Sequence, residues 1–436
     1  MMITAQKCCL ALLLAVPFSV AAETLAESIA ADYETRLDPL FKHFHSHPEL
    51  SGVEFETARR MASELRDLGY EVTEGVGGTG VVAVLENGPG PTVMIRADMD
   101  GLPVQEDTGL AYASIARQKN PGGDEFPVMH ACGHDVHITA LVGTARQLMQ
   151  RKAAWSGTAI LIVQPAEETI SGARAMLQDG LYERFPKPEY ALAFHVDADG
   201  EAGKINVPLA ITGSSSDSVD IIVHGVGTHG AYPHQGVDPV LVAAQIVVSL
   251  QSIVSRTISP LEPGVITVGA IHGGTKHNII GDKVEMQLTV RSDSFETRKT
   301  LLAAIKRVAD GVAASLGVPA ELMPEVIYSS TETTPPTIND EATARRVRSA
   351  LLENLGADMI VDNPRTGMGA EDFAYFVDPS LGVKGVYFDV GGTPADQLGS
   401  APSHHSPFFK IQPEPSIKSG IEAMVVSAIA LMPPAE

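Results

Sequence analysis

The amino-acid sequence predicts an α/β protein: a catalytic domain with a mostly parallel sheet and helices on both of its faces, interrupted by a ferredoxin-like α+β domain. Two observations lead to this class. In the first and last parts of the chain, short apolar segments bounded by glycine or proline alternate with helical patterns, which is typical of a parallel sheet. Between those parts, the elements follow the order βαββαβ of a split βαβ unit. The length of 436 residues, 44% of them hydrophobic, is enough for more than one domain.

The catalytic domain begins with a helical pattern over residues 23–66, which His47-Pro48 and Ser51-Gly52 interrupt. Strands and helices then alternate, and we expect them in this order: strands 81–85 and 92–96, helix 138–150, strand 158–163, helix 172–177 and strand 190–194. The same pattern resumes after Thr333-Thr334-Pro335-Pro336 and continues to the end of the chain.

The inserted domain follows a run of serine, threonine and glycine at residues 212–216. Its expected elements are strand 218–224, helix 237–255, strands 265–271 and 283–291, helix 295–316 and strand 320–328. We therefore divide the chain into a signal segment (1–22), a catalytic domain (23–212 and 330–436) and an inserted lid or dimerisation domain (213–329).

Charge and the N-terminal segment indicate where the protein works. The formal net charge is −22, from 53 acidic and 31 basic residues, so nucleic acids and anionic membrane surfaces are not expected partners. Residues 1–22 resemble a secretory signal, with Lys7, an apolar stretch over 8–20 and small residues at 19–22. A membrane anchor is the alternative, but the stretch is shorter than the roughly 20 residues that a span needs. We expect an exported protein, periplasmic or secreted, without a membrane span after signal cleavage.

Side chains that can bind a metal follow the ends of the predicted strands. Asp98 and Asp100 follow strand 92–96, Glu167-Glu168 follow strand 158–163, and His195 follows strand 190–194. Because ligands bind beyond the carboxyl ends of parallel strands, these groups are expected to lie at one edge of the sheet. Each alone has an ordinary explanation, such as a structural histidine or a solvated acidic turn. Together they predict a metal site.

The segment Met129-His130-Ala131-Cys132-Gly133-His134-Asp135-Val136-His137 supplies a thiol and imidazoles, which favour zinc or another borderline divalent cation. Cys132 is the only cysteine outside the predicted signal, and a metal would protect its thiol in an oxidising compartment. Cys132 as a catalytic nucleophile is the competing interpretation. Neighbouring acids can divide the work, one binding the cation while the other acts as general base. A glycine-rich turn in the inserted domain presents His229, which is either an oxyanion donor or an ordinary loop histidine.

The motifs together resemble the aminoacylase/carboxypeptidase metallopeptidase family, in its amidohydrolase branch with hippurate hydrolase and the indole-acetyl-amino-acid hydrolases. The matching segments occur in order along nearly the whole mature chain: His47-Pro48-Glu49-Leu50, residues 96–103, 129–137 and 164–168, His195, residues 227–234, Gly273-Gly274 with Asn278, residues 369–373 and His405-Ser406-Pro407.

The resemblance implies a role for several residues. It implies a centre of two divalent metals held by Cys132, His134, Glu168, His195 and His405. Glu167 falls at the position of the general base, and Asp100 at that of the acid that supports the site. His229 matches a histidine that reaches the active site of a partner subunit, which implies a homodimer through the inserted domain. Asn278 and Arg291 match substrate-binding positions, whereas His404 does not match a ligand position.

Three departures concern the mouth of the site and therefore the substrate. Thr169 replaces a glycine after the paired acids, Ile279-Ile280-Gly281 replaces Val-Ile-Pro, and residues 117–127 form a longer segment than usual. The expected function is hydrolysis of the amide of N-acyl or N-aroyl amino acids, or of a related small amide, by metal-activated water. Zinc is the expected cation, with manganese, cobalt or nickel as alternatives.

Two other functions remain open from the sequence. An exported dipeptidase or carboxypeptidase could use the same centre, with Glu371 or Asp372 receiving the substrate's ammonium group. A non-catalytic metal- or peptide-binding protein would be expected to lack the base, yet Glu167 is present.

Overall fold

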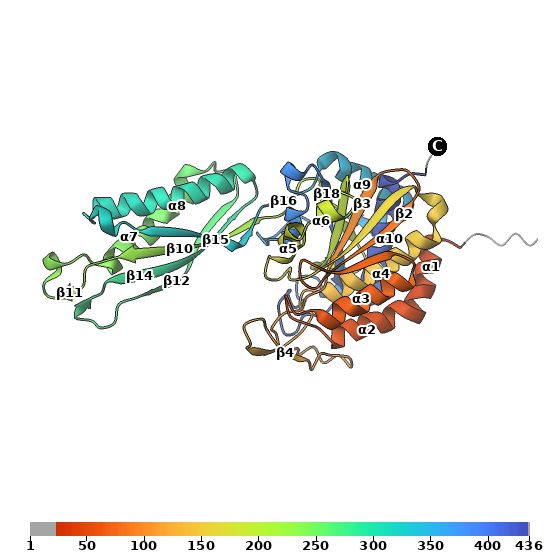
Figure 1. The fold of residues 1–436 in the computed structure, drawn as a ribbon, viewed down its shortest axis with the longest axis horizontal. Coiled ribbons are helices and arrows are strands. Elements are labelled where there is room, and N and C mark those ends of the chain that lie inside the picture. The colour runs from red at the N-terminus through yellow and green to blue at the C-terminus, as the bar shows by residue number, and fades with distance from the viewer. Residues whose placement is uncertain (1–22, 435–436) are drawn as a thin grey trace, which may run out of the picture.

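The computed structural model describes residues 23–434, so the predicted signal segment lies outside the described residues. Figure 1 shows two lobes side by side, joined where the chain leaves the catalytic domain before β10 (Ser215–His224) and returns to it after β15 (Glu325–Thr334). The larger lobe carries the eight-stranded sheet and both ends of the described chain. The smaller lobe is the inserted domain.

The sheet of the catalytic domain is mixed, with a parallel centre. Its strand order is β1-β2-β6-β3-β7-β18-β8-β17. In that order the strands are β1 (Glu71–Val76), β2 (Gly80–Asn87), β6 (Gly157–Gln164), β3 (Thr92–Asp98), β7 (Tyr190–Glu201), β18 (Lys384–Thr393), β8 (Ile205–Asn206) and β17 (Ile360–Val361). The central strands β6, β3, β7 and β18 are parallel. The pairs β1–β2, β2–β6 and β18–β8 are antiparallel, and the edge strand β17 pairs parallel with β8. The predicted fold class is confirmed.

Helices cover both faces of this sheet because successive side chains of the buried strands point to opposite sides. In β3, Val93 and Ile95 belong to one apolar core and Met94 to the other. The first core is closed by α1 (Leu25–Asp32), α2 (Asp38–Ser46), α3 (Phe55–Asp67), α4 (His134–Gln150), α9 (Glu341–Leu355) and α10 (Pro413–Leu431). The second is covered by α5 (Gly172–Gln178) and α6 (Leu181–Arg184).

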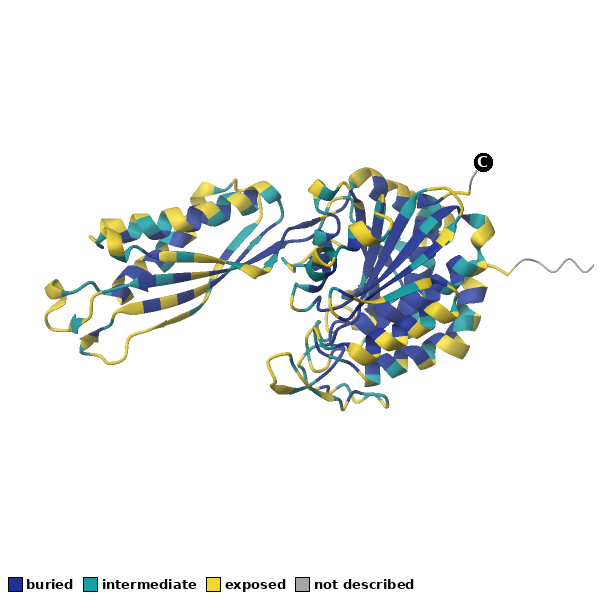
Figure 2. Ribbon diagram, in the orientation of Figure 1, coloured by how far each residue is buried: buried dark blue, intermediate teal, exposed yellow. Residues whose placement is uncertain are grey.

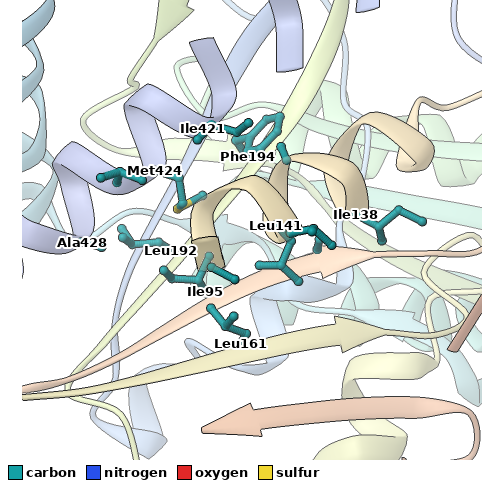
Figure 3. Close-up of a cluster of buried hydrophobic side chains, with 14 of the residues drawn as sticks. Ile95, Ile138, Leu141, Leu161, Leu192, Phe194, Ile421, Met424 and Ala428 are labelled. Carbon is teal, nitrogen blue, oxygen red and sulfur yellow. The ribbon is translucent and has the colours of Figure 1, made fainter. Parts of the chain in front are cut away.

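Figure 3 shows the centre of the first core, where α4 and α10 pack next to each other on the same face of the sheet. Leu141 of α4 lies over Ile95 of β3, and Ile421 of α10 lies next to Phe194 of β7. The first turn of α4 carries His134, so this packing fixes the helix end that faces the predicted metal site. The predicted helix 138–150 begins four residues earlier than expected because Gly133, with φ +86°, lets the chain turn directly into it.

The inserted domain is an antiparallel sheet covered on one face by two helices. Its strand order is β12-β14-β10-β15, with β12 (Gly264–Gly273), β14 (Lys283–Ser292), β10 (Ser215–His224) and β15 (Glu325–Thr334), and its helices are α7 (Pro239–Ser252) and α8 (Phe295–Ser315). Residues of β14 alternate between buried and exposed, which Figure 2 shows as stripes along the strands. One face therefore packs on the helices while the other faces solvent.

The last predicted strand of this domain was placed too early. Residues Ala320–Leu322 form a 3-10 turn, and the strand runs over Glu325–Thr334 instead of 320–328. Pro319 and Pro324 flank the turn, and proline has no backbone N–H to donate to a neighbouring strand.

Within the described residues, one helix is long and apolar enough to be considered for a membrane span. It is the 19-residue helical segment Pro239–Thr257, with a mean hydropathy of 1.5. Its inner face, including Val242, Ile246 and Leu250, belongs to the core of the inserted domain. On its outer face Val240, Leu241 and Val248 are exposed.

Candidate metal centre and active site

The predicted metal-binding side chains converge at the carboxyl ends of the parallel strands. Asp98 ends β3, Glu167 and Glu168 follow β6, and His195 lies in β7. His134 is the first residue of α4, Cys132 lies two residues before it, and His405 comes from the loop that follows β18. The structure brings together all five ligands that the family resemblance implies.

Their ligand atoms form overlapping groups. Cys132, His134 and His195 make one group in which the ligand atoms all lie within 4.8 Å of one another, and Cys132, Glu168 and His405 make another. The Cys132 Sγ atom lies 3.4 Å from His195 Nε2, and His405 Nε2 lies 3.4 Å from a Glu168 carboxylate oxygen. Together the two groups supply enough ligand atoms for more than one cation, and Cys132 belongs to both.

Hydrogen bonds on the far side of each imidazole fix which nitrogen faces the centre. His134 Nδ1 lies 2.8 Å from the carbonyl oxygen of Asp100, and His195 Nδ1 lies 2.8 Å from that of Val196. Since only an N–H can donate to a carbonyl, Nε2 of each ring keeps a lone pair for a metal. His137 differs, because its Nδ1 contacts Asp98 and its Nε2 accepts the Val196 N–H. It therefore has no nitrogen left to bind a metal.

Polar atoms without a partner show that a cation fits here. Among the described residues, His134 Nε2 and Glu168 Oε1 are buried and have no hydrogen-bond partner. Such atoms are costly unless something binds them. Burial, and then the charges of Glu168 and Glu167, raise the pKa of the Cys132 thiol well above its usual value. A divalent cation would satisfy these atoms and hold the sulfur as a thiolate.

Glu167 stands beside the ligands in a strongly acidic environment. Its carboxylate lies within 4.8 Å of those of Glu371 and Asp372 and of a second group formed by His134 and Glu168. Burial, followed by the charges of Glu371 and Glu168, raises its pKa well above the ordinary range. A group held so close to the ligands, with a raised proton affinity, can accept and return a proton.

The backbone that carries the paired acids is held by Asp100. Its carboxylate accepts the N–H groups of Glu167 and Glu168 at 3.1 and 3.0 Å, and Ser51 Oγ donates to it at 2.6 Å. Asp100 therefore contacts the backbone of both paired acids, and its role in the reaction stays a prediction. His404, which was not expected to be a ligand, accepts the Ala198 N–H with its Nε2 atom.

A buried arginine next to the centre was not predicted as a site residue. The Arg96 guanidinium is fully buried and lies 2.8 Å from Asp98, 2.7 Å from Glu371 and 3.3 Å from Asp372. Burial alone would lower the pKa of Arg96, but these three carboxylates raise it well above its usual value. The signal was present in the sequence, since a charged residue in the apolar strand Thr92–Asp98 needs buried partners.

The same contacts occupy Glu371 and Asp372, the two acids that a dipeptidase would need for a substrate ammonium group. Glu371 also accepts the Tyr387 O–H at 2.7 Å and the Phe373 N–H at 2.8 Å. Asp372 accepts from Gln164 and from the Ala173 N–H. Both carboxylates therefore already have a cationic partner and hydrogen-bond donors inside the protein.

A cavity of about 730 Å³ adjoins the ligand His195. Its wall includes Asn206, Arg365, Glu371 and Asp389. Arg365 bridges to the inserted domain, donating to Ser214 Oγ at 3.1 Å and pairing with Asp293. This hollow is the space in which a small substrate can approach the metal-binding residues.

The structure does not bring the three residues predicted from the inserted domain to this centre. His229 lies in β11 (Thr228–His229) and is exposed, and β11 pairs with β13 (Ile279–Ile280) next to Asn278. Figure 1 shows β11 at the end of the inserted domain farthest from the catalytic sheet. Arg291 lies in β14 opposite Ser216 and contacts Thr289. Within a single chain His229 therefore has no active site to serve.

The fold and the donor set define a metal-dependent hydrolase that acts on amide bonds. The model of peptidase family M20/M25/M40 matches residues 94–429, and the chain belongs to this family, which confirms the resemblance drawn from its motifs.

Relatives within the family have different names. Hippurate hydrolase of Campylobacter jejuni is 35% identical over 348 residues, which cover 80% of this chain and 86% of that protein. Thermostable carboxypeptidase 1 of Saccharolobus solfataricus is 34% identical over 393 residues, covering 89% and 93%. A solved Bacillus subtilis structure, described as a dinuclear metal binding peptidase from the M20 family, is similar with a TM-score of 0.75 and 29% identity, covering 92% of this chain and 99% of that one.

Proposed function

We propose that this enzyme hydrolyses the amide bond of N-acyl or N-aroyl amino acids, using two divalent cations held by Cys132, His134, Glu168, His195 and His405. The convergence of these donors beside Glu167 carries the proposal. When bound, the cations would polarise the substrate carbonyl and lower the pKa of water. The thiolate and imidazole ligands favour zinc, and manganese, cobalt or nickel are the alternatives.

The chain's own residues would act in sequence. Glu167 takes a proton from the attacking water and later delivers it to the leaving amine, so that the carboxyl group returns to its starting state. Asp100 keeps the Glu167 and Glu168 backbone in place through its two amide contacts. Arg96 holds Glu371 and Asp98 at the edge of the same site.

Because Glu371 and Asp372 are paired with Arg96, the site favours substrates whose amino group is acylated over free dipeptides. A dipeptidase needs a carboxylate that is free to pair with the substrate's ammonium group, and both of these acids are paired with Arg96. An uncharged acyl group makes no such demand. A carboxypeptidase acting on longer blocked peptides remains the second candidate, since one relative bears that name.

We also propose a homodimer through the inserted domain. His229 is exposed at the tip of that domain, and Val240, Leu241 and Val248 form an apolar stripe on the outer face of α7. A partner subunit covering this face would remove apolar surface from water and could place its His229 at the active site to stabilise the oxyanion. Export of the mature chain after removal of residues 1–22 is likewise a proposal, supported by the signal-like sequence.

A substrate panel tests the proposed function. Zinc-reconstituted protein is assayed on N-acetyl and N-benzoyl amino acids, on free dipeptides and on N-blocked dipeptides. We expect kcat/KM to be at least about 100-fold higher for acylated amino acids than for free dipeptides, because the latter bring an unpaired ammonium group to the site. A preference for free dipeptides would reject the amidohydrolase assignment, and a preference for blocked dipeptides would favour the carboxypeptidase.

A further inference from the structure

Backbone strain in this protein is concentrated in the loops that carry the metal-binding residues. Among the described residues, the non-glycine residues with positive φ are Ala166 (50°), Ile170 (53°) and His405 (65°). Two of them flank Glu167 and Glu168, and the third is itself a candidate ligand. Left-handed backbone is unfavourable for residues with a side chain, most of all for a β-branched residue such as isoleucine. Other contacts must therefore hold residues 165–171, the loop that carries the paired acids Glu167 and Glu168 (the paired-acid loop), in this conformation.

Three successive backbone N–H groups of this loop point at buried carboxylates from other parts of the chain. The N–H groups of Glu167 and Glu168 donate to Asp100, as described above. The N–H of Ala166 donates to the carboxylate of Glu54 at 2.9 Å. Both acids are almost completely buried, with Glu54 0% and Asp100 1% exposed. The three N–H groups of this strained turn are thus all bonded to two carboxylates of the same chain.

Glu54 is itself held in place by contacts independent of the metal centre. The oxygen that accepts from Ala166 also accepts the Gly52 N–H at 2.7 Å, and the other oxygen accepts the Thr79 O–H at 2.5 Å. Thr79 lies in the turn between β1 and β2, and Glu54 immediately precedes α3. The carboxylate therefore ties the paired-acid loop to two elements that lie outside the site.

We propose that Glu54 is a positioning residue that fixes Ala166 in its left-handed conformation and so aims Glu167 and Glu168 at the metal centre. The inference rests on the proposed roles of those two acids. Glu54 touches neither the ligand atoms nor the cavity. Glu54 acts on the paired acids only indirectly, because its hydrogen bond to the Ala166 N–H offsets the backbone strain at Ala166.

The test combines Glu54→Ala with Ala166→Gly. Glu54→Ala removes the acceptor, so the loop should relax, kcat should fall roughly 10- to 100-fold and zinc affinity roughly tenfold or more, while KM changes little. Glycine adopts positive φ without strain, so Ala166→Gly in the same chain should restore kcat and zinc affinity at least partly. Glu54→Gln keeps an oxygen acceptor for the Ala166 N–H and should retain at least about a third of the kcat.

Zinc affinity, measured by competition with a chelator, separates this proposal from the assignment of the reaction. If no amide is hydrolysed, the affinities of the variants still report the position of Glu168. The proposal is overturned if Glu54→Ala leaves both kcat and zinc affinity within threefold of the starting protein, or if Ala166→Gly adds to the loss instead of reversing it. If Glu54→Ala does not fold, a kcat of the Glu54→Gln protein below a tenth of the starting value overturns it, because that variant keeps the bond.

Discussion

At the scale of single residues, this active site is a balance of buried charges. Asp98, Glu371 and Asp372 surround the single guanidinium of Arg96, and the Glu167 carboxylate lies next to the last two of these acids. An excess of carboxylates over positive groups is unfavourable in a buried site without cations. Metal binding and the folded geometry of this site should therefore depend on each other.

The buried histidine His45, which lies next to α4, should make the stability of the protein depend on pH. His45 contacts Asp135 at 2.7 Å and Glu106 at 3.1 Å, and its side chain is 6% exposed. Burial alone would lower the pKa of His45, but these hydrogen bonds raise it to about 9. Because the folded pKa exceeds the ordinary value of 6.5, the stabilisation is complete below pH 6.5 and is lost as the pH rises through 9.

We therefore expect His45 to contribute about 3 kcal/mol to the free energy of unfolding at pH 6, and most of this to be lost by pH 9.5. Urea unfolding of chelator-treated protein at several pH values measures the effect, with His45→Gln as the comparison. The variant should be less stable at pH 6 and show a flatter dependence between pH 6.5 and 9.5. If the free energy of unfolding changes with pH to the same extent in both proteins, His45 is not the source of this pH dependence.

At the scale of elements, the convergence of the candidate ligands could be predicted from the sequence because these residues lie next to local signals. Cys132 and His134 open a helix, and Glu167-Glu168 directly follow an apolar strand, so their common edge follows from strand direction alone. Glu54 was not predicted, because its partner Ala166 is 112 positions away and only packing brings them together. The pairing of Arg96 with Glu371 was not predicted for the same reason, because these residues are 275 positions apart. Boundaries failed where turn chemistry outweighed the apolar pattern, as at Pro319 and Pro324.

The join between the paired-acid loop and α5 allows a sharp test at this scale. A Cβ atom added to Gly172 would lie 1.6 Å from the carbonyl oxygen of Pro165, so the backbone of the loop would have to move. We expect Gly172→Ala to lower the free energy of unfolding by roughly 1 to 3 kcal/mol and kcat by more than tenfold.

Gly311→Ala is the matched control for this substitution. Gly311 lies in α8, and nothing within 4 Å would meet its Cβ atom. Because alanine favours helix more than glycine does, this change should raise the stability by about 0.5 to 1 kcal/mol and leave kcat unchanged. Thermal unfolding and steady-state kinetics measure both variants. Equal effects of the two substitutions would mean that the close packing at Gly172 has no influence on the site.

At the scale of the whole molecule, the two lobes separate the metal ligands from His229. The proposed dimer makes the active site a joint product of two chains, and this can be tested by mixing inactive variants. Glu167→Gln destroys the base and His229→Ala the oxyanion donor. In a mixed dimer, however, one of the two sites combines an intact Glu167 with an intact His229 of the partner subunit.

Co-expression of the two variants should therefore restore about a quarter of the activity of the starting protein, assuming random pairing and two equivalent sites per dimer. Each variant alone should stay at least about 100-fold below the starting protein. Leu241→Asp on the outer face of α7 should prevent the restoration and give monomers in sedimentation analysis. No restoration by dimers of confirmed mixed composition would show that His229 does not act across the interface.

The central claim is that Glu167 is the base of amide hydrolysis within a two-cation centre, and one measurement tests it most directly. Zinc content and kcat on an N-acyl amino acid are determined on the same preparations of the starting protein and of Glu167→Gln. If Glu167 is the base, we expect close to two zinc ions per chain in both proteins and a kcat that is roughly 100- to 10,000-fold lower in the variant. A variant that binds two zinc ions and retains kcat within about tenfold of the starting protein would contradict it.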